Sequence, residues 1–367
     1  MIKKNLIPSI DYQPDNYDQM LDQKVKDVCC LLADLKIPKP SIFPSIKYGY
    51  RMRAEFRVWH EDSNCFYVMF DKNKNPIKIN SYPIGSPAIT NIMFPLIEFI
   101  NESKILKNKL FQIEFLGSQN DKCIATLIYH KAINQTWIDI AKKMEKKFNI
   151  HVIGRSRKQK ICISQDFLEE TFNIKNEKYI MIQKENSFTQ PNASINERMM
   201  NWLCENLSRE NNDLLELYCG NGNFTIPLAK LFRSVLATEI SKSSIETAKK
   251  NCILNHTNNI SFVRLSAEET TQALKKERDF RRLKDVDLNQ YNFKTVLVDP
   301  PRSGLDNITL KLVGSFDKIL YISCNPSTLK TNLIELTKSH DIIHFAVFDQ
   351  FPYTRHCECG VILERRS

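Results

Sequence analysis

The chain has 367 residues, of which 42% are hydrophobic and 26% are charged, as in an ordinary soluble globular protein. The formal net charge of +10 suits a polyanionic partner such as RNA without requiring one. The 11 cysteines include no Cys-x-x-Cys pair, which excludes the usual zinc and iron–sulfur spacings, and no apolar run is long enough for a membrane helix. With no signal peptide expected after Met1, these features indicate a cytoplasmic protein with free thiols.

Residues 1–180 predict an α+β domain that begins with a helix. An amphipathic pattern over 17–35 predicts that helix, and Pro38 and Pro40 follow its end. The segment 51–59 alternates charged and apolar residues, as a half-exposed strand does. The further elements expected in this domain are strands at 66–70, 110–116, 123–129 and near His151 and Lys160, and helices at 89–103 and 137–147.

The strand expected at 51–59 is a candidate RNA contact. Arg51, Arg53 and Arg57 share one face of it, where they could hold phosphates while aromatic residues such as Phe56 and Trp59 pack or stack on bases. A second basic cluster lies at 155–160. Each cluster alone fits a solvated surface equally well, so RNA contact by this domain stays open at this point.

Residues 181–367 alternate strands and helices, which predicts a parallel, doubly wound α/β sheet of the Rossmann-like kind. A polar connector at 186–192 leads into it, and 268–290 is expected to be a charged helical insertion. The remaining elements expected are helices at 194–207 and 243–255 and strands at 213–217, 234–238, 260–265, 295–298, 319–323, 342–348 and 359–364.

The turn after the first of these strands has the features of a nucleoside site. Gly220-x-Gly222 stands between a strand and a helix, where the backbone can approach a ligand closely. Glu239 ends the next strand, the position that binds ribose hydroxyls in Rossmann-like folds. Because a third glycine and a basic residue for a pyrophosphate are both missing, the pattern favours a nucleoside without phosphates, S-adenosylmethionine being the obvious one.

Asp299-Pro300-Pro301-Arg302 ends another strand, and the two prolines fix the direction of Asp299. Asp299 could bond the cofactor or a flipped base, and Arg302 could meet a phosphate or a base. Similar turns occur in enzymes that methylate exocyclic amino groups, but that chemistry has no use for the cysteine that ends the next strand, Cys324.

A thiolate is required when the methyl acceptor is a pyrimidine carbon. Uracil C5 becomes nucleophilic only after addition of a group such as a thiolate to C6. A base must then remove the C5 proton, and both Glu358 and His356 are candidates for it on the residues alone.

The chain resembles the RNA (uracil-5-)-methyltransferase family over nearly its whole length. The motifs that carry the resemblance are 188–190 (Phe-Thr-Gln), 217–224 (Leu-Tyr-Cys-Gly-Asn-Gly-Asn-Phe), 298–302 (Val-Asp-Pro-Pro-Arg), 323–326 (Ser-Cys-Asn-Pro) and 349–354 (Asp-Gln-Phe-Pro-Tyr-Thr). The resemblance implies Cys324 as the nucleophile and Glu358 as the base. It implies that S-adenosylmethionine is held by Gln190, Tyr218, Asn223, Glu239 and Asp299.

Within that family the chain is most similar to the branch that methylates the T-loop uridine of tRNA. The ribosomal branch carries an additional N-terminal β-barrel and a four-cysteine iron–sulfur cluster, for which this chain has neither the length before residue 45 nor the cysteine spacing. The expected partner is therefore the T arm of tRNA, contacted by Arg51, Arg53, Arg302 and Phe188, the last as a stacking partner for a flipped base. No metal, membrane or obligate protein partner is expected. Another T-loop-like RNA as substrate, or an RNA-binding or RNA-folding protein, are the alternatives.

Overall fold

A computed structural model describes residues 7–8 and 10–366 of the chain. The described residues form two compact units that are discontinuous in sequence. Unit 1 contains the described residues up to Tyr17 together with 46–170 and 183–193, and unit 2 contains 18–45, 171–182 and the chain from Ser194 onward. The expected division into 1–180 and 181–367 has a single boundary, and as an assignment of domains it stays a prediction.

Unit 1 is built on a seven-stranded sheet in the order β4-β3-β2-β5-β6-β7-β8. Its strands alternate buried and accessible residues: in β2, Ala54, Phe56 and Val58 point into the core. The strands are β2 (Arg53–Glu61), β3 (Asn64–Phe70), β4 (Pro76–Lys78), β5 (Leu110–Gly117), β6 (Cys123–Tyr129), β7 (His151–Ser156) and β8 (Gln159–Cys162).

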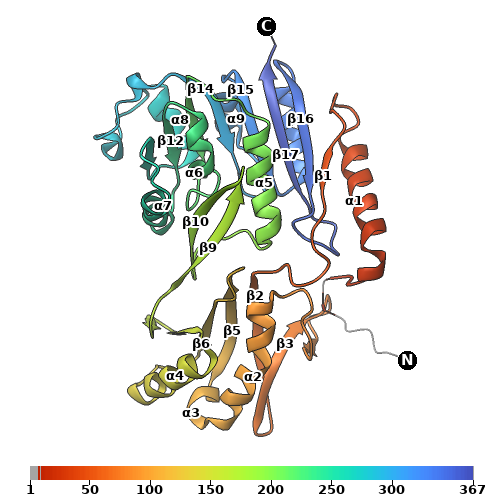
Figure 1. Ribbon diagram of the computed structural model, residues 1–367, viewed down its shortest axis with the longest axis vertical. Coiled ribbons are helices and arrows are strands. Elements are labelled where there is room, and N and C mark those ends of the chain that lie inside the picture. The colour runs from red at the N-terminus through yellow and green to blue at the C-terminus, as the bar shows by residue number, and fades with distance from the viewer. Residues whose placement is uncertain (1–6, 9, 367) are drawn as a thin grey trace. The chain divides into compact units, whose positions relative to one another are not determined.

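The helices α2 and α4 contact this sheet (Figure 1). Asn134 accepts a hydrogen bond from the Trp137 amide and so begins α4, and Asn149 ends it in a left-handed conformation. Trp137 packs against Gly154 of β7, where a Cβ atom would lie 2.5 Å from the indole ring. The helical segments of the unit are η1 (Pro14–Asn16), α2 (Pro87–Glu102), α3 (Lys104–Lys107) and α4 (Gln135–Phe148).

Unit 2 contains an eight-stranded sheet in the order β1-β16-β17-β15-β14-β11-β12-β13. Residues such as Leu214, Val296 and Ile319 are fully buried, as expected for a sheet covered on both faces. The strands are β1 (Ser41–Phe43), β11 (Asp213–Leu217), β12 (Val235–Thr238), β13 (Ile260–Val263), β14 (Phe293–Val298), β15 (Lys318–Ser323), β16 (His340–Phe348) and β17 (Glu358–Arg365).

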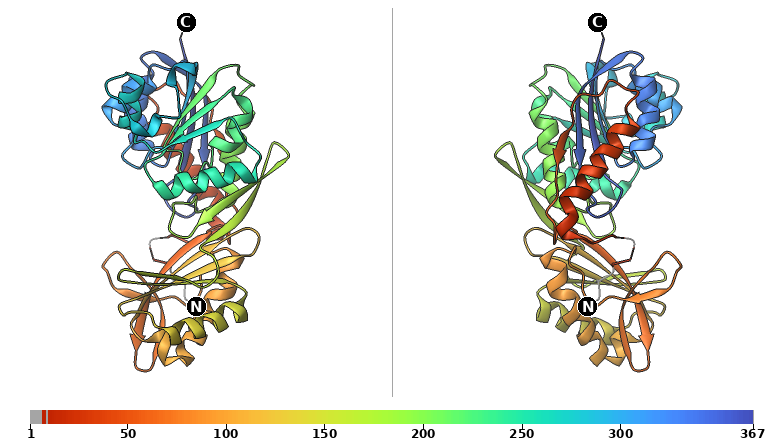
Figure 2. Two further views of the ribbon diagram at one scale, coloured as in Figure 1. Left: turned by 90° about the vertical axis from the view of Figure 1, so that its left-hand side faces the viewer. Right: turned by 90° about the vertical axis from the view of Figure 1, so that its right-hand side faces the viewer.

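Helices cover both faces of that sheet (Figure 2). They are α1 (Tyr17–Leu31), α5 (Ala193–Glu205), α6 (Thr225–Leu228), α7 (Lys242–Leu254), α8 (Ala267–Leu274), α9 (Asn307–Val313) and α10 (Pro326–Leu336), with the 3-10 turns η2 (Ala229–Leu231), η3 (Arg281–Leu283) and η4 (Leu288–Gln290). The hairpin of β9 (Phe167–Ile174) and β10 (Glu177–Lys184) forms a separate two-stranded sheet.

The direction of the strands brings several chain segments to one edge of the unit 2 sheet. β11, β12, β13, β14 and β15 are parallel, so their carboxyl ends share that edge. β17 is antiparallel to both β15 and β16, so its amino end lies at the same edge. We call this the carboxyl edge, and the opposite side the amino edge.

The structure confirms the α/β character of the second half but corrects several details. The sheet is not purely parallel, because β17 runs against its neighbours. The segment 268–290 is helical only to Leu274 and then continues in turns and short 3-10 pieces. The first helix ends at Leu31 instead of residue 35. The sequence pattern also missed the β9–β10 hairpin and β1, which is only three residues long.

Among the described residues, no helix is both long and apolar enough to cross a membrane.

Candidate active site

Cys324 stands at the carboxyl edge directly after β15. Two hydrogen bonds fix the turn around it. The Ser323 hydroxyl donates to the Asn325 carbonyl oxygen at 3.2 Å and accepts from the Asn325 amide at 3.3 Å. The Asn325 side chain accepts from the Ser327 amide and so begins α10, with Pro326 in its first turn. The thiol is therefore held between a buried strand and a capped helix, while Cys324 itself keeps partial exposure.

Glu358 lies on the neighbouring strand at the same height. The antiparallel register pairs Ser323, the last residue of β15, with Cys359 of β17, so Cys324 and Glu358 lie opposite each other directly after this pair. The Glu358 side chain is only 3% exposed. Its Oε2 atom is buried and has no hydrogen-bond partner among the described residues. A buried carboxyl oxygen without a partner is costly and rare, which marks this position as a functional candidate.

Asp299 follows β14, the strand on the other side of β15. Its carboxyl group interacts electrostatically with both Cys324 and Glu358. Arg302 is exposed and acts on the same two groups with the opposite sign. The structure thus brings together four of the predicted residues: a thiol, two carboxyl groups and a guanidinium.

The enclosure of this cluster favours the neutral forms of its acids. Burial, followed by the charges of Glu358 and Asp299, raises the pKa of Cys324 to about 11. Burial raises the pKa of Asp299 to about 7. Burial and then the Asp299 charge hold the pKa of Glu358 well above its ordinary value, whereas Arg302 opposes both the Cys324 and the Glu358 shifts. The cluster is therefore set to respond to any cation or dipole that enters it.

The turn between β11 and α6 forms a second part of the carboxyl edge. Tyr218, Gly220 and Gly222 all have left-handed backbones, with φ of 62°, 55° and 83°. Glu239, which follows β12, accepts from the Gly220 amide at 3.2 Å and from the Ser241 amide at 2.8 Å. Glu239 therefore holds the turn in place in addition to any role toward a ligand.

Asn223 is already engaged through its side chain. Its amide exchanges two hydrogen bonds of 2.8 Å with the amide of Asn196 on α5. Tyr218 is partly buried, which raises the pKa of its hydroxyl, and the charge of Asp306 adds to that shift. Both residues lie at the carboxyl edge, as the sequence predicts.

Glu216 is a candidate that the sequence reasoning missed. It is the fourth residue of β11, only 2% exposed, and its Oε2 atom is buried without a partner among the described residues. Burial raises the pKa of Glu216 to about 8; the nearby Thr225 hydroxyl opposes this shift and the Asp299 charge adds to it. The available signal was an acidic residue inside the apolar run 213–217, directly before the Gly220-x-Gly222 turn.

Lys24 on α1 is a second residue without a sequence signal. It is 6% exposed and bonds the buried Asp349 carboxylate at 2.5 Å and the Phe351 carbonyl at 3.1 Å. The two ends of this ion pair are 325 residues apart in sequence. Lys24 thereby fixes the 349–354 segment that leads into Glu358.

His356, the competing base, is exposed, and its pKa is lowered by burial and by the charges of Arg302 and Lys24. Its ring lies 6.3 Å from that of Phe351. The described part of the chain gives the His356 ring no hydrogen bond that would orient it as a base.

The remaining predicted residues belong to unit 1. Phe188 is 76% exposed, which leaves its ring free for stacking, and Gln190 is partly buried. Arg53 donates to the carbonyl oxygens of Lys184, Glu185 and Ser187 at 3.4, 3.0 and 2.9 Å, so it braces the 184–187 segment. Arg51 donates to the Arg53 carbonyl at 2.9 Å. Both arginines therefore hold the protein backbone in place, and their contact with RNA stays a prediction.

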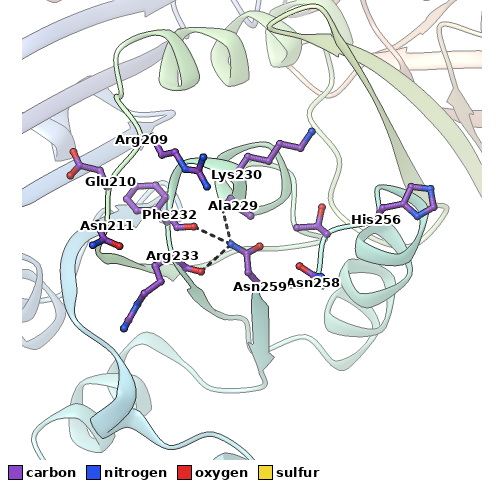
Figure 3. A pocket seen from close by; sticks show the side chains of 11 residues that line it. Arg209, Glu210, Asn211, Ala229, Lys230, Phe232, Arg233, His256, Asn258 and Asn259 are labelled. Carbon is purple, nitrogen blue, oxygen red and sulfur yellow. Dashed lines mark hydrogen bonds between the residues drawn. The ribbon is translucent and has the colours of Figure 1, made fainter.

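A pocket of about 920 Å³ lies elsewhere in unit 2, at the amino edge (Figure 3). It is formed by the loops before β11, β12 and β13, where Asn259 donates to the carbonyl oxygens of Ala229 and Phe232. None of the predicted site residues lines it. We place the active site at the carboxyl edge because the unpaired buried acids are there. No group of three or more metal-binding side chains is found among the described residues.

Comparisons with known proteins identify the family of the chain. The family model described as tRNA (Uracil-5-)-methyltransferase matches residues 16–366. A tRNA/tmRNA (uracil-C(5))-methyltransferase of Colwellia psychrerythraea is 47% identical over 358 residues, covering 96% of this chain and 98% of that protein. The protein of the same name from Cellvibrio japonicus is 48% identical, with coverages of 97% and 98%.

Among solved structures, the tRNA (uracil-54, C5)-methyltransferase of Pyrococcus abyssi in complex with S-adenosyl-L-homocysteine shares the fold. Its TM-score is 0.72 at 22% identity, and the match covers 95% of this chain and 83% of that one. On the extent of these matches, the chain belongs to the tRNA (Uracil-5-)-methyltransferase family.

Proposed function

We propose that this protein transfers a methyl group from S-adenosylmethionine to C5 of the T-loop uridine of tRNA, through a covalent bond between Cys324 and uracil C6. The observation that carries the proposal is the β15–β17 register, which sets the Cys324 thiol beside the buried, unpaired carboxyl of Glu358. A nucleophile and a base at one point are what substitution at a pyrimidine carbon requires. The curated relatives, named as tRNA/tmRNA (uracil-C(5))-methyltransferases, support the substrate class.

The residues of the carboxyl edge fit S-adenosylmethionine. Residues 218–224 contain no lysine or arginine, so the turn suits a ligand without phosphates. The unpaired Oε2 of Glu216 is an acceptor for an ammonium group such as that of the methionine part. Tyr218, Asn223, Glu239 and Asp299 of the carboxyl edge would hold the cofactor, and the family resemblance adds Gln190 to the expected cofactor residues. The cofactor supplies an electrophilic methyl group.

Cys324 begins the reaction. Its thiol must first lose a proton to solvent, and the positive charge of Arg302 favours the thiolate against the effects of burial. The thiolate then adds to uracil C6, and the electrons of the C5–C6 double bond move toward O4. The resulting enolate makes C5 nucleophilic enough to take the methyl group.

Glu358 completes the reaction. As a carboxylate it takes the C5 proton, after which the C5–C6 double bond re-forms and the Cys324 sulfur leaves C6. The high pKa that burial and Asp299 give Glu358 makes it a strong base once it is ionised. Asp299, which lies near both Cys324 and Glu358, forms a hydrogen bond with the cofactor or with the flipped uracil.

The target uracil must leave its stack to reach Cys324, and the exposed ring of Phe188 suits a stacking role for the flipped base. Unit 1 is the proposed RNA-binding domain, with Arg51 and Arg53 near its RNA contact, and Arg302 serves the RNA at the catalytic edge. A tRNA substrate agrees with the expected cytoplasmic location.

The direct test is incubation of the protein with unmodified tRNA and labelled S-adenosylmethionine, followed by mapping of the methylated nucleotide. Cys324→Ala is expected to abolish methyl transfer and leave tRNA affinity within about twofold, because the thiol makes the reacting bond and carries no positive charge for the RNA phosphates. Cys30→Ala, which removes an exposed thiol, is the matched control and keeps full activity. Methyl transfer by Cys324→Ala would rule out the covalent route.

Two alternatives are separated by the same materials. An amino-group methyltransferase would not form a covalent bond to RNA that contains 5-fluorouracil, whereas Cys324 is expected to be trapped on it because fluorine at C5 cannot be removed as a proton. A protein that only binds or folds RNA would bind tRNA without transferring label. Methyl transfer to another T-loop-like RNA, with none to tRNA, would point to the alternative substrate.

A further inference from the structure

Unit 1 contains a second cationic site, away from Arg51 and Arg53. A pocket of about 330 Å³ is formed by the second half of α4, the start of β7 and the turn between β5 and β6. Three lysines line it: Lys142 and Lys146, one turn apart on α4, and Lys122 from the β5–β6 turn. We call this the lysine pocket.

The three lysines are exposed, and none has an ion-pair or hydrogen-bond partner for its ammonium group within the described part of the chain. Lysines near the end of a helix are favoured by its dipole, which accounts for Lys146. The dipole does not account for Lys122, which comes from another element and lies near His151, whose pKa is lowered by burial and, to a smaller extent, by the Lys122 charge. Like charges at i and i+4, as in Lys142 and Lys146, also destabilise a helix slightly.

The acidic residues of α4 offset only part of the positive charge of the pocket. Glu145 lines it, but its Oε2 accepts a hydrogen bond of 2.8 Å from the Val152 amide. Asp139 is held by Gln135 at 2.9 Å. Lys147 stacks over the rings of Phe99 and Phe148 and does not line the pocket. With three lysines and one glutamate, the lining of the pocket keeps an excess of two positive charges around polar groups such as His151 and Ser164, which bond each other at 2.7 Å.

The strand register connects this pocket to the predicted RNA contact. Arg53 of β2 pairs with Leu116 of β5, Leu116 with Ile124 of β6, and Ile124 with His151 of β7. These four residues form one row across the same end of the unit 1 sheet. With about 4.8 Å between neighbouring strands, Arg53 and His151 are about 14 Å apart along that row. Cationic groups thus lie at both ends of this row: Arg53 at one end, and the lysine pocket around His151 at the other.

We propose that the lysine pocket binds phosphate groups of the RNA backbone, so that the RNA follows the sheet end of unit 1 from Arg51 to Lys142 and Lys146. Lysine acts here as a point charge on phosphate oxygens, which contributes affinity without reading sequence. The inference rests on the proposed function, because it takes the partner to be the RNA substrate of the same protein.

The test is a triple variant, Lys122→Ala with Lys142→Ala and Lys146→Ala, in the full chain. Its control is Lys249→Ala with Lys250→Ala and Lys311→Ala, three exposed lysines of unit 2 that give the same change in net charge. A third protein replaces the pocket lysines by arginine. Equilibrium binding of unmodified tRNA is measured at 50 and 200 mM salt, and methyl transfer is measured at saturating tRNA.

The pocket variant is expected to bind tRNA about tenfold more weakly at 50 mM salt, with a salt dependence reduced by about two phosphate contacts. Its kcat at saturating tRNA and its KM for S-adenosylmethionine stay unchanged, and the arginine variant restores affinity. Unchanged affinity, or equal losses in the pocket and control variants, would overturn the proposal. If the wild-type protein binds tRNA without methylating it, the proposed function fails while a selective loss in the pocket variant still supports the site.

Discussion

The two edges of the unit 2 sheet differ in whether their buried ionisable side chains have hydrogen-bond partners. At the amino edge, two buried ionisable side chains are paired: Asp213 accepts from Arg233 Nε at 2.9 Å, and His340 Nε2 bonds the Phe316 carbonyl at 2.8 Å. At the carboxyl edge, Glu216 and Glu358 each keep a buried oxygen without a partner. Paired buried charges stabilise a fold, whereas unpaired ones cost free energy and persist where a ligand or a reaction uses them.

The contrast also shows why the size of a pocket is a poor guide to the site in this protein. The pocket of Figure 3 lies at the amino edge, where charged groups such as Arg233 and Lys230 are bonded to carboxylates. The carboxyl edge is identified instead by its buried carboxyl oxygens, which have no hydrogen-bond partner among the described residues. Substitutions at the two edges should therefore separate activity from stability.

The largest effect is expected for Glu358→Gln. Turnover should fall by about 10³-fold, because an amide cannot take the C5 proton, and a covalent protein–RNA adduct should accumulate. Denaturing gel electrophoresis with labelled tRNA detects the adduct. His356→Gln is the control and should retain activity within about twofold. Absence of an adduct in Glu358→Gln, with an adduct in His356→Gln, would transfer the role of base to His356.

Glu216→Gln should act on the cofactor. Loss of a charge-assisted bond to an ammonium group predicts S-adenosylmethionine binding weaker by about 10- to 100-fold, measurable by calorimetry. In the cofactor-free protein the pKa of Glu216 is about 8, above its ordinary 4.5, so its contribution to stability is full below pH 4.5 and is lost as pH rises toward 8. That loss is about 4 kcal/mol at most between pH 5 and 8.

The same variant should consequently lose less stability than the wild type between pH 5 and 8 when no cofactor is present. Chemical denaturation at the two pH values measures this difference. Equal pH dependence in the two proteins, with unchanged cofactor affinity, would mean that Glu216 is an ordinary buried residue.

Arg233→Ala should have the smallest effect on activity and a clear effect on stability. It leaves the fully buried Asp213 with only the Asn292 backbone amide as a partner, which predicts a loss of about 1–3 kcal/mol in the free energy of unfolding. Lys242→Ala breaks an exposed pair with Glu246 and should cost less than about 0.5 kcal/mol. A fall in kcat of Arg233→Ala per folded molecule would contradict the division between the edges.

The sequence predicted the reactive residues of the carboxyl edge better than the buried residues and the strand direction that position them. Turn motifs after apolar strands locate Tyr218, Asp299 and Cys324, because strand ends of a parallel sheet meet at one edge. Glu216 and Lys24 were not predicted, because the burial of an acidic residue in a strand or of a lysine in an amphipathic helix is known only from the packing. The reversed direction of β17, which sets Glu358 at the site, follows from long-range pairing that no local pattern encodes.

The position of β1 and α1 has a practical consequence for dissecting the protein. Both lie within residues 17–45, between the first two segments of unit 1, yet residues 18–45 belong to unit 2, where β1 pairs in parallel with β16. A fragment that begins at residue 181 would lose β1, so the backbone of β16 would become an open sheet edge, a known route to aggregation. It would also leave the carboxylate of Asp349 without Lys24. A soluble fragment that contains unit 2 would therefore have to keep residues 18–45 and 171–182 as well as the chain from Ser194 onward.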